Sequence, residues 1–152
     1  MNTPRTSGFT LLEMTIVIAL VGVVAAFTVG VSVDSIARSS VAQERDLFVT
    51  LLLRGARASA LANIKGVSHG IQIDNTNHEY ILFDGTTYNS AATTNRHIPY
   101  TNNKLSVSNT GGTTIIFEQL SGAVGTGAGT ITLSNGVQSQ TIVIRNSGQI
   151  DW

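Results

Sequence analysis

The sequence contains no cysteine, which excludes disulfide bonds, thiolate metal sites and cysteine nucleophiles. Proline is also scarce: Pro4 and Pro99 are the two occurrences, so the long stretch between them contains no helix-breaking ring. Charged residues make up 12 % of the chain, a low share for a soluble domain. Their formal sum is zero, so the overall charge does not favour nucleic acid or an anionic surface as a partner.

The shortage of charge is greatest near the N-terminus. No charged residue occurs between Met14 and Val33. A helical run of about 20 residues is roughly 30 Å long, which matches the hydrocarbon thickness of a bilayer. This run is too long for the apolar region of a secretory signal, and Glu13 lies near its start. We therefore expect a hydrophobic transmembrane helix over residues 9–34.

Glu13 is unusual in this setting, because an unpaired carboxylate within hydrocarbon costs on the order of 3 kcal/mol. Arg5 is the only basic side chain before Arg38. Cleavage after Gly8 would create a further cation, the α-amine of Phe9, which is protonated near neutral pH. Glu13 could neutralise that amine in its own chain or in a neighbouring subunit. The alternative is that Glu13 is solvated at the membrane interface.

The residues around Glu13 form a specific motif. Gly8-Phe9-Thr10-Leu11-Leu12-Glu13 follows a short polar leader and precedes the long apolar run. This arrangement resembles the class III (prepilin) signal of type IV pilins and type II secretion pseudopilins. The resemblance implies that residues 1–8 are a leader peptide and that a membrane prepilin peptidase cuts between Gly8 and Phe9. It also implies N-methylation of Phe9 and a role for Glu13 in assembly.

One feature departs from this family. Many members have a helix-kinking proline about two thirds of the way along the apolar helix, whereas this chain has Gly30 and no proline there. Glycine weakens a helix interior by about 1 kcal/mol relative to alanine, so Gly30 could act as a softer hinge.

The following segment, residues 35–66, is predicted to be an amphipathic helix that continues the apolar one as a single rod. One broad face carries apolar or small residues at helical spacing, and we expect this face to pack on a sheet: Val41, Phe48, Leu51, Leu52, Gly55, Ala58 and Ala62. Val49 and Leu53 fall off this stripe. They are candidates for subunit contacts, or ordinary exposed apolar residues.

Residues 67–152 are predicted to form a β-rich globular domain. Six short segments carry β-branched and alternating residues: Val67–Asp74, Glu79–Phe83, Lys104–Ser108, Thr113–Glu118, Gly129–Ser134 and Gln138–Asn146. Asn135-Gly136 predicts a hairpin between the last two. Residues 84–103 read as a long exposed loop, either functional or merely tolerated. The predicted fold class is α+β, with the long helix packed on an antiparallel sheet.

This second half carries a looser resemblance to the H-type minor pseudopilins (the GspH/FimT/FimU group). It rests on the end of the long helix and on the C-terminal strands, namely Leu53-Arg54-Gly55-Ala56-Arg57-Ala58-Ser59-Ala60-Leu61-Ala62, Gly66-Val67, Phe117, Gly122, Gly125, Gly127, Thr130-Ile131-Thr132-Leu133, Ile142-Val143-Ile144 and Ser147-Gly148-Gln149-Ile150. Together the two resemblances cover nearly the whole chain.

The sequence shows no sign of enzymatic chemistry. His69, His78 and His97 lack ligand-like spacing; a weak metal site from His69, His78, Asp74 and Glu79 is a lesser alternative to surface histidines. The glycine-rich run over residues 122–127 lacks the lysine and helix of a phosphate loop, so we expect a hairpin or loop. No motif frames a serine as a nucleophile. We predict no enzyme, no metal and no cofactor.

The resemblances imply a minor pseudopilin of a type II secretion system at or near the tip of a periplasmic filament. The implied location is the bacterial inner membrane, spanned once, with the C-terminal domain in the periplasm. The implied partners are other pseudopilins or pilins, the prepilin peptidase, the inner-membrane assembly platform, and membrane lipid before assembly. A minor type IV pilin serving pilus assembly or DNA uptake is the alternative, and an uncleaved monotopic sensor or enzyme a further one. The C-terminal tail is not basic, which disfavours nucleic acid.

Overall fold

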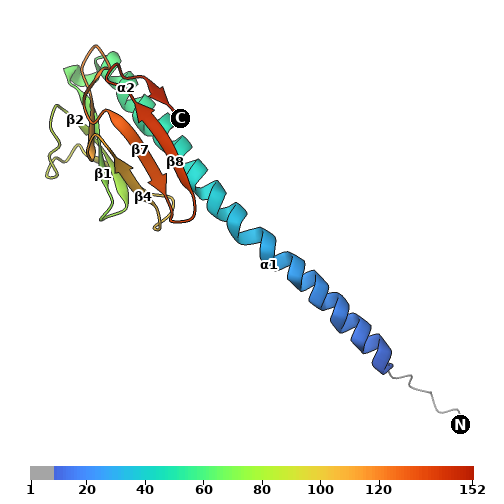
Figure 1. Ribbon diagram of the computed structural model, residues 1–152. Helices are drawn as coiled ribbons and strands as arrows, with labels where there is room; N and C mark the ends of the chain where they lie inside the picture. The colour runs from blue at the N-terminus through green and yellow to red at the C-terminus, as the bar shows by residue number, and fades with distance from the viewer. Residues whose placement is uncertain (1–8) are drawn as a thin grey trace, which may run out of the picture. The chain divides into compact units, whose positions relative to one another are not determined.

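The computed structural model describes residues 9–152, and for residues 27–39 it describes the helical backbone without the side chains. The chain divides into two units, residues 1–36 and 37–152. Helix α1 (Leu11–Leu47) begins in the first unit, and the remaining helices and all strands of the described chain belong to the second (Figure 1). Helix precedes antiparallel sheet, so the predicted α+β class is confirmed. Gly8, the predicted last residue of the leader, lies outside the described residues.

The described side chains of the first unit, residues 9–26, are all exposed. Among the residues that the structure describes, no helix is both long enough and apolar enough to cross a membrane. The transmembrane helix predicted over residues 9–34 stays a prediction, because its side chains from residue 27 onward lie outside the described residues.

In the second unit, α1 runs into a π-helix, η1 (Phe48–Leu53), and then into α2 (Arg54–Leu61). The N–H of Arg54 bonds the carbonyl of Val49, five residues back. A π-helix holds more residues in each turn than an α-helix, so residues spaced by four stay on one face. The buried face of η1 and α2 follows that spacing: Phe48, Val49, Leu52, Leu53, Ala56 and Ala60.

The predicted stripe was therefore partly wrong. Val49 and Leu53 belong to the core and are not surface positions, whereas Leu51 is 60 % exposed. Ala58 and Ala62 are also exposed. The reason is the change of helical period, because the prediction continued an α-helical spacing through the π-helical segment.

The helix ends sharply and close to its predicted end. Ala62 is the C-terminal cap of α2, and Asn63 and Lys65 adopt positive φ angles of 54° and 59°. A short 3₁₀ turn, η2 (Ile64–Gly66), then leads to the first strand. Residues with positive φ cannot continue a right-handed helix, so the chain turns away here.

The strands form two antiparallel sheets and not the single sheet that the sequence predicts. The first has the order β3-β2-β1-β5-β6 and comprises β1 (His69–Asp74), β2 (Glu79–Asp84), β3 (Arg96–Pro99), β5 (Thr114–Phe117) and β6 (Val124–Thr126). The second has the order β4-β7-β8-β9 and comprises β4 (Ser106–Asn109), β7 (Gly129–Ser134), β8 (Ser139–Ile144) and β9 (Ile150–Asp151). Strand β4 lies between β3 and β5 in the sequence, yet it pairs with β7 in the second sheet. The alternating pattern of β4 does not specify this distant partner.

All six predicted strands are present, with ends shifted by a few residues, but three short strands were missed. One of them, β3, lies inside the predicted loop 84–103 and pairs only with β2, so Pro99 occupies an edge strand, where proline is tolerated. Another, β6, lies within the glycine-rich run 122–127, which was predicted as a hairpin or loop. These strands are too short to show an alternating pattern.

The predicted hairpin is confirmed. Strands β7 and β8 pair from Gly129↔Ile144 to Ser134↔Ser139, and Gly136 in the turn has a φ of 85°. The Asn135 side-chain oxygen accepts the N–H groups of Val137 and Gln138 at 3.0 and 2.9 Å. The turn is thus closed by the two residue types that favour it.

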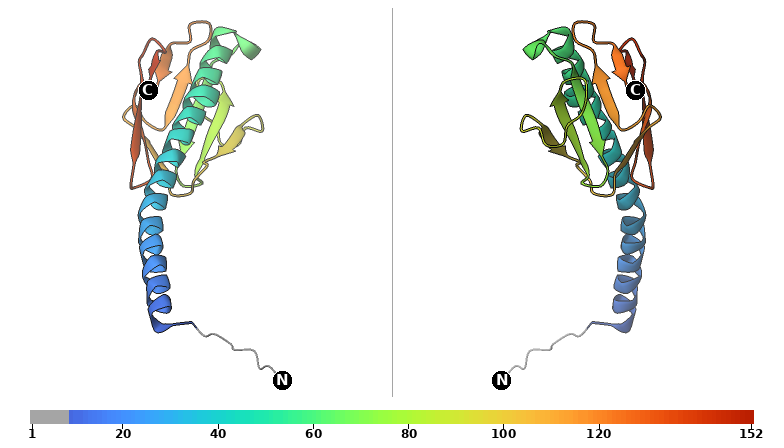
Figure 2. Two further views of the ribbon diagram at one scale, coloured as in Figure 1. Left: turned by 90° about the vertical axis from the view of Figure 1, so that its right-hand side faces the viewer. Right: turned by 90° about the vertical axis from the view of Figure 1, so that its left-hand side faces the viewer.

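The core of residues 37–152 lies between the helical segment and the two sheets, and Figure 2 shows this segment running along both. Phe48 from the helix contacts the ring of Tyr80 on β2 at 4.8 Å between centroids, and Tyr80 contacts Tyr100 at 4.5 Å. The second sheet supplies Ile131, Leu133 and further aliphatic residues to the same core. Burial of these side chains is the main favourable term in the stability of this unit.

A buried carboxylate fastens α1 to the segment after β3. Glu44 is fully buried, and its Oε2 accepts hydrogen bonds from the backbone N–H of Thr101 at 2.9 Å and from the Thr101 hydroxyl. Burial, and next the Glu44 charge, raise the pKa of Tyr80 well above its usual range. The second Glu44 oxygen has no hydrogen-bond partner among the described residues. The two bonds from Thr101 offset part of the cost of burying this polar side chain.

A second polar cluster fastens the helix end to the first sheet. His69, predicted to be a surface residue, is only 7 % exposed. Its Nδ1 lies 2.9 Å from an Asp84 oxygen, and its Nε2 lies 3.0 Å from the carbonyl of Ile64. Both ring nitrogens thus face oxygen atoms, and the ring links the segment after α2 to strand β2. Lys65 donates to the other Asp84 oxygen at 2.6 Å, and this bond leads the causes that lower the Asp84 pKa.

Glu44→Ala is expected to destabilise the protein by about 1–3 kcal/mol, because it leaves the N–H and hydroxyl of Thr101 without their acceptor. Glu44→Gln keeps an acceptor oxygen and should cost less. Urea unfolding of the purified chain, followed by circular dichroism, measures both. Glu118→Ala is the matched control, since Glu118 is exposed. Equal unfolding midpoints for Glu44→Ala and the control would show that the buried carboxylate contributes nothing.

Asp84→Asn is expected to cost stability only where Asp84 is ionised. The folded-state pKa of Asp84 is lowered from 3.8, so its stabilising contribution is fully present above that value. The contribution disappears as the pH falls through the lowered pKa. The difference in unfolding midpoint between wild type and Asp84→Asn should thus be present at neutral pH and vanish in acid. A difference that stays constant with pH contradicts this assignment.

Candidate processing and assembly site

The predicted cleavage position lies immediately before a capped helix. Phe9 is 77 % exposed and precedes the first helical residue, Leu11. The Thr10 carbonyl accepts the backbone N–H groups of Glu13 and Met14 at 3.1 and 3.2 Å. The Thr10 hydroxyl accepts the N–H of Glu13 as well, at 3.3 Å. Thr10 is therefore the helix N-cap, and Phe9 lies outside the helix where an enzyme can reach it.

Glu13 lies in the first turn of α1 and is exposed. A threonine N-cap followed three residues later by glutamate is the pattern of a capping box, and a negative charge in this turn is favoured by the helix dipole. Sequence reasoning missed this cap, although the Thr-Leu-Leu-Glu spacing could have revealed it. In this chain Phe9 is joined to Gly8, so the free amine expected to pair with Glu13 exists only after cleavage.

Apart from Glu13, the described part of the first unit presents a mostly apolar surface. Its large exposed apolar side chains are Leu11, Leu12, Met14, Ile16, Val17, Ile18, Leu20, Val21, Val23 and Val24, each at least half exposed. A contiguous apolar surface of this kind is a site for membrane or protein contact. The motif residues thus lie at the start of a surface that requires an outside partner.

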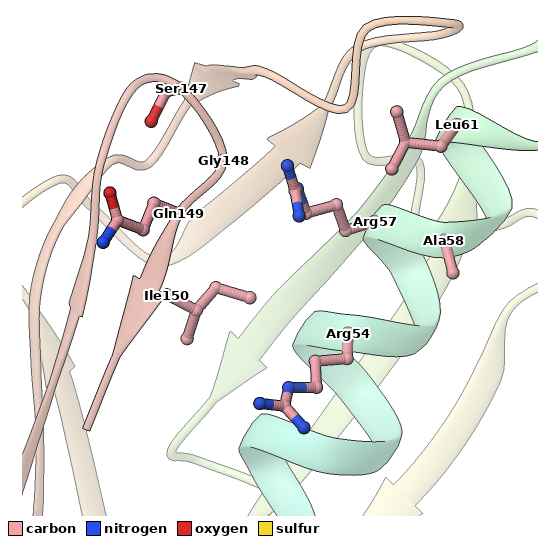
Figure 3. A pocket seen from close by; sticks show the side chains of 8 residues that line it. All are labelled: Arg54, Arg57, Ala58, Leu61, Ser147, Gly148, Gln149 and Ile150. Atoms are coloured by element: carbon pink, nitrogen blue, oxygen red, sulfur yellow. The ribbon is translucent and has the colours of Figure 1, made fainter.

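A groove in the second unit is a separate candidate site (Figure 3). It has a volume of about 620 Å³ and lies between α2 and the loop joining β8 to β9, with lining residues Arg54, Arg57, Ala58, Leu61, Ser147, Gly148, Gln149 and Ile150. The groove brings together two segments that carry the resemblance to H-type pseudopilins, the Ala/Arg-rich helix end and Ser147-Gly148-Gln149-Ile150. The sequence suggested both segments but not their contact.

Two contacts hold the arginines of this groove. The Arg54 guanidinium lies 4.4 Å from the centroid of the Trp152 ring, a cation–π distance. Arg57 Nε donates to the carbonyl of Gly122 at 3.3 Å. Gly148 is buried with a φ of 80°, and a β-carbon there would lie 2.0 Å from the Gly122 carbonyl oxygen. Glycine at position 148 therefore permits the close approach of the β8–β9 loop to Gly122, which precedes β6, and to the Arg57 side chain of α2.

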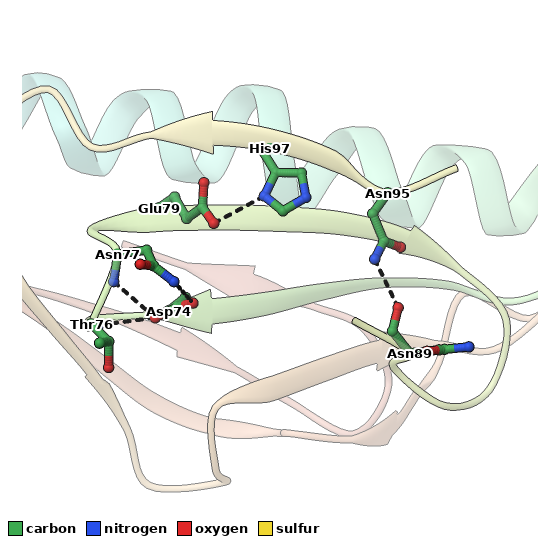
Figure 4. A network of polar contacts seen from close by, with 7 residues as sticks. All are labelled: Asp74, Thr76, Asn77, Glu79, Asn89, Asn95 and His97. Atoms are coloured by element: carbon green, nitrogen blue, oxygen red, sulfur yellow. Dashed lines mark hydrogen bonds and ion pairs between the residues drawn. The ribbon is translucent and has the colours of Figure 1, made fainter. Parts of the chain in front are cut away.

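The residues weighed as a metal site serve structural purposes. The Asp74 carboxylate accepts the N–H groups of Thr76 and Asn77 and the Asn77 side-chain amide, closing the β1–β2 turn (Figure 4). The bonds from Asn77 are the main cause that lowers the Asp74 pKa. His97 instead contacts Glu79 at 2.9 Å. Among the side chains that the structure describes, no three of metal-binding type form a cluster.

The predicted loop 84–103 is partly ordered by its own polar residues. The Asn95 side chain donates to the Asn89 carbonyl at 2.8 Å (Figure 4), and the Asn89 side chain accepts the N–H of Ala91 at 3.0 Å. The second half of the segment then pairs as β3. None of these contacts indicates a catalytic arrangement.

Two family models match the chain. The prokaryotic N-terminal methylation motif matches residues 3–29, which include Gly8, Phe9 and Glu13. The type II transport protein GspH matches residues 49–148, more than half of the chain, including every strand except β9 and most of the groove. No curated protein and no solved structure matches the chain significantly. The family is one of structural pilin-like proteins and not of enzymes. The chain therefore belongs to the GspH family of type II transport proteins and carries the prokaryotic N-terminal methylation motif at its start.

Proposed function

We propose that this chain is a minor pseudopilin of a type II secretion system, a structural subunit at or near the tip of a periplasmic pseudopilus. The observation that carries the proposal is the exposed apolar helix surface that begins at the methylation motif, within a GspH-family chain. Such a surface needs a cover that the described residues do not provide. Lipid of the inner membrane covers it before assembly, and helices of other pseudopilins cover it in the filament.

Maturation begins at the N-terminus. A prepilin peptidase cuts between Gly8 and Phe9, and Phe9 is then N-methylated. The position of Phe9 ahead of the Thr10 cap supports this step, because the new amine would emerge outside the helix without disturbing its first turn. N-methylation keeps the amine basic, so its charge is available for pairing.

Glu13 acts as the acceptor for that amine during assembly. A carboxylate at the edge of an apolar surface is costly when it enters a helix bundle without a cation. The Phe9 amine of a neighbouring, staggered subunit supplies the cation and sets the register between the two helices. The assembly platform of the inner membrane and the peptidase are the further partners of this route.

The alternative is a minor type IV pilin in pilus assembly or DNA uptake, which shares the same processing. Its DNA-uptake form needs a basic surface. In the C-terminal region Arg145 is paired with Asp151 at 3.1 Å, and the tail carries no further basic residue. The charge of this region thus supports the secretion subunit over a DNA-capturing one.

Processing of the leader is the first test of the function. In the native host, or with a co-expressed prepilin peptidase, the chain should lose its first eight residues and carry an N-methyl group on Phe9. Intact-mass measurement detects both changes. Gly8→Ala is expected to be partly cleaved, whereas Gly8→Leu should block cleavage because of its bulk. An unprocessed Met1 terminus in the native host would falsify the proposal.

Glu13→Leu separates assembly from anchoring. The variant should enter the membrane fraction and be cleaved as wild type, yet fail to join the filament, because the neighbouring amine loses its acceptor. Filament incorporation is measured by crosslinking, and cleavage by mass.

The matched control is Thr10→Ala, which removes the hydroxyl cap but keeps the carboxylate. It should incorporate as wild type if Glu13 acts by pairing. Normal incorporation of Glu13→Leu contradicts the pairing. Equal loss in both variants assigns the effect to the helix cap instead.

A further inference from the structure

We propose that the groove between α2 and the β8–β9 loop binds an acidic peptide segment of a neighbouring subunit. A carboxylate of that segment bonds Arg54 and Arg57, and an adjacent apolar side chain lies against Leu61 and Ile150. The inference rests on the proposed function, since it supplies a contact between the globular domains of a filament.

The charge of the groove is the first ground. Arg54 and Arg57 lie one helical turn apart on α2 and both line the groove. Three other basic residues have acidic partners, in the pairs Arg45–Asp46, Lys65–Asp84 and Arg145–Asp151. Among the described residues, no carboxylate lies within ion-pair distance of either groove arginine. The two guanidinium groups leave a local positive charge on a chain whose formal charge is zero.

The donor geometry selects a carboxylate-like anion. Arg57 uses its Nε on the Gly122 carbonyl, and this bond leaves its terminal amino groups for a ligand. The Arg54 guanidinium lies over the Trp152 ring, and a contact with the face of a ring leaves N–H donors for a ligand. Guanidinium groups bind planar anions through two parallel hydrogen bonds, and such charge-assisted bonds are stronger than neutral ones.

The rest of the lining selects a peptide over a free anion. Leu61 is 44 % exposed, and Ala58 and Ile150 present further apolar surface to the groove. Trp152, half exposed, lies beside it under Arg54. Arginine and tryptophan are enriched among the residues that dominate binding at protein interfaces. A ligand with both a carboxylate and an aliphatic side chain uses all of these groups.

Nucleic acid fits this groove less well. A polyanion needs a row of basic groups along its backbone, and the groove offers two. Asp151, the residue after the lining residue Ile150, is paired with Arg145. Arg145 therefore adds no unpaired positive charge next to the groove. The remaining polar lining residues, Ser147 and Gln149, are uncharged.

The groove is preformed. The close approach of Gly148 to Gly122 and the bond from Arg57 to the Gly122 carbonyl fix the loop against α2. A β-carbon at position 148 would also lie 2.7 Å from Arg57 Nε, so the Gly148 backbone packs closely against this side chain. A rigid site pays less conformational entropy on binding.

Peptide binding by the full-length chain in detergent tests the inference. The probe is a short fluorescein-labelled peptide in which two glutamates alternate with leucines, and fluorescence anisotropy measures its Kd. Arg54→Gln and Arg57→Gln should each weaken binding by roughly tenfold, the effect of one charge-assisted hydrogen bond. Lys104→Gln, at an exposed position away from the groove, is the matched control and should bind as wild type.

Two further arms settle the ligand class. The same peptide with glutamines in place of glutamates should bind at least roughly tenfold more weakly, since the carboxylate is lost. A short single-stranded oligonucleotide should not displace the peptide. No binding of the glutamate peptide by wild type overturns the inference, as does arginine-dependent binding of the oligonucleotide in preference to it. Of the two arginine variants, Arg54→Gln is expected to disturb folding less. Arg54 contacts the Trp152 ring, whereas Arg57 bonds the Gly122 carbonyl beside the β8–β9 loop.

A photo-crosslinking residue at position 149 connects the groove to the filament. In cells, it should link the chain to a neighbouring subunit, and Arg54→Gln should reduce the product several-fold while leader cleavage stays unchanged. If the chain is processed and incorporated but this crosslink is unaffected by Arg54→Gln, the groove inference fails alone. If the wild-type chain is never processed, the proposed function fails, and the peptide measurement still decides the groove.

Discussion

The packing of one helical face against two sheets is the interaction on which the second unit depends. Phe48 and Leu52 are fully buried in a core to which both sheets contribute, so one helical face packs against side chains of both. The π-helical turn keeps Val49 and Leu53 on the same face. Without that change of period the four-residue spacing would drift around the helix and expose part of the face.

Polar contacts decide how this packed helix is fastened to the strands. Glu44 bonds Thr101 in the interior, and Arg45 reaches Gln140 on β8 at 3.1 Å. Near the other end, Asp84 joins the helix terminus to the first sheet through Lys65 and His69. These contacts are directional, whereas apolar burial is not, so they select one position of the helix among several that bury similar area.

The first unit has the opposite character. Its described side chains are apolar and exposed, and its one described charge, Glu13, lies in the capped first turn. An exposed apolar surface of this size is a site for contact with lipid or protein. The family matches indicate a pilin-like protein, a class that assembles into filaments. The two units thus differ: the first carries the N-terminal methylation motif, and the second is a packed domain with a groove of its own.

The sequence by itself determined the local elements and the N-terminal motif. Periodicity and turn residues indicated the helix, six strands and the Asn135-Gly136 hairpin, because these depend on neighbouring residues. Only the tertiary structure decided that the strands divide into two sheets, that Glu44 is buried and that Arg57 meets Gly148. These features arise between segments far apart in the chain, where packing and close backbone approach choose the partner, and local patterns are compatible with several choices.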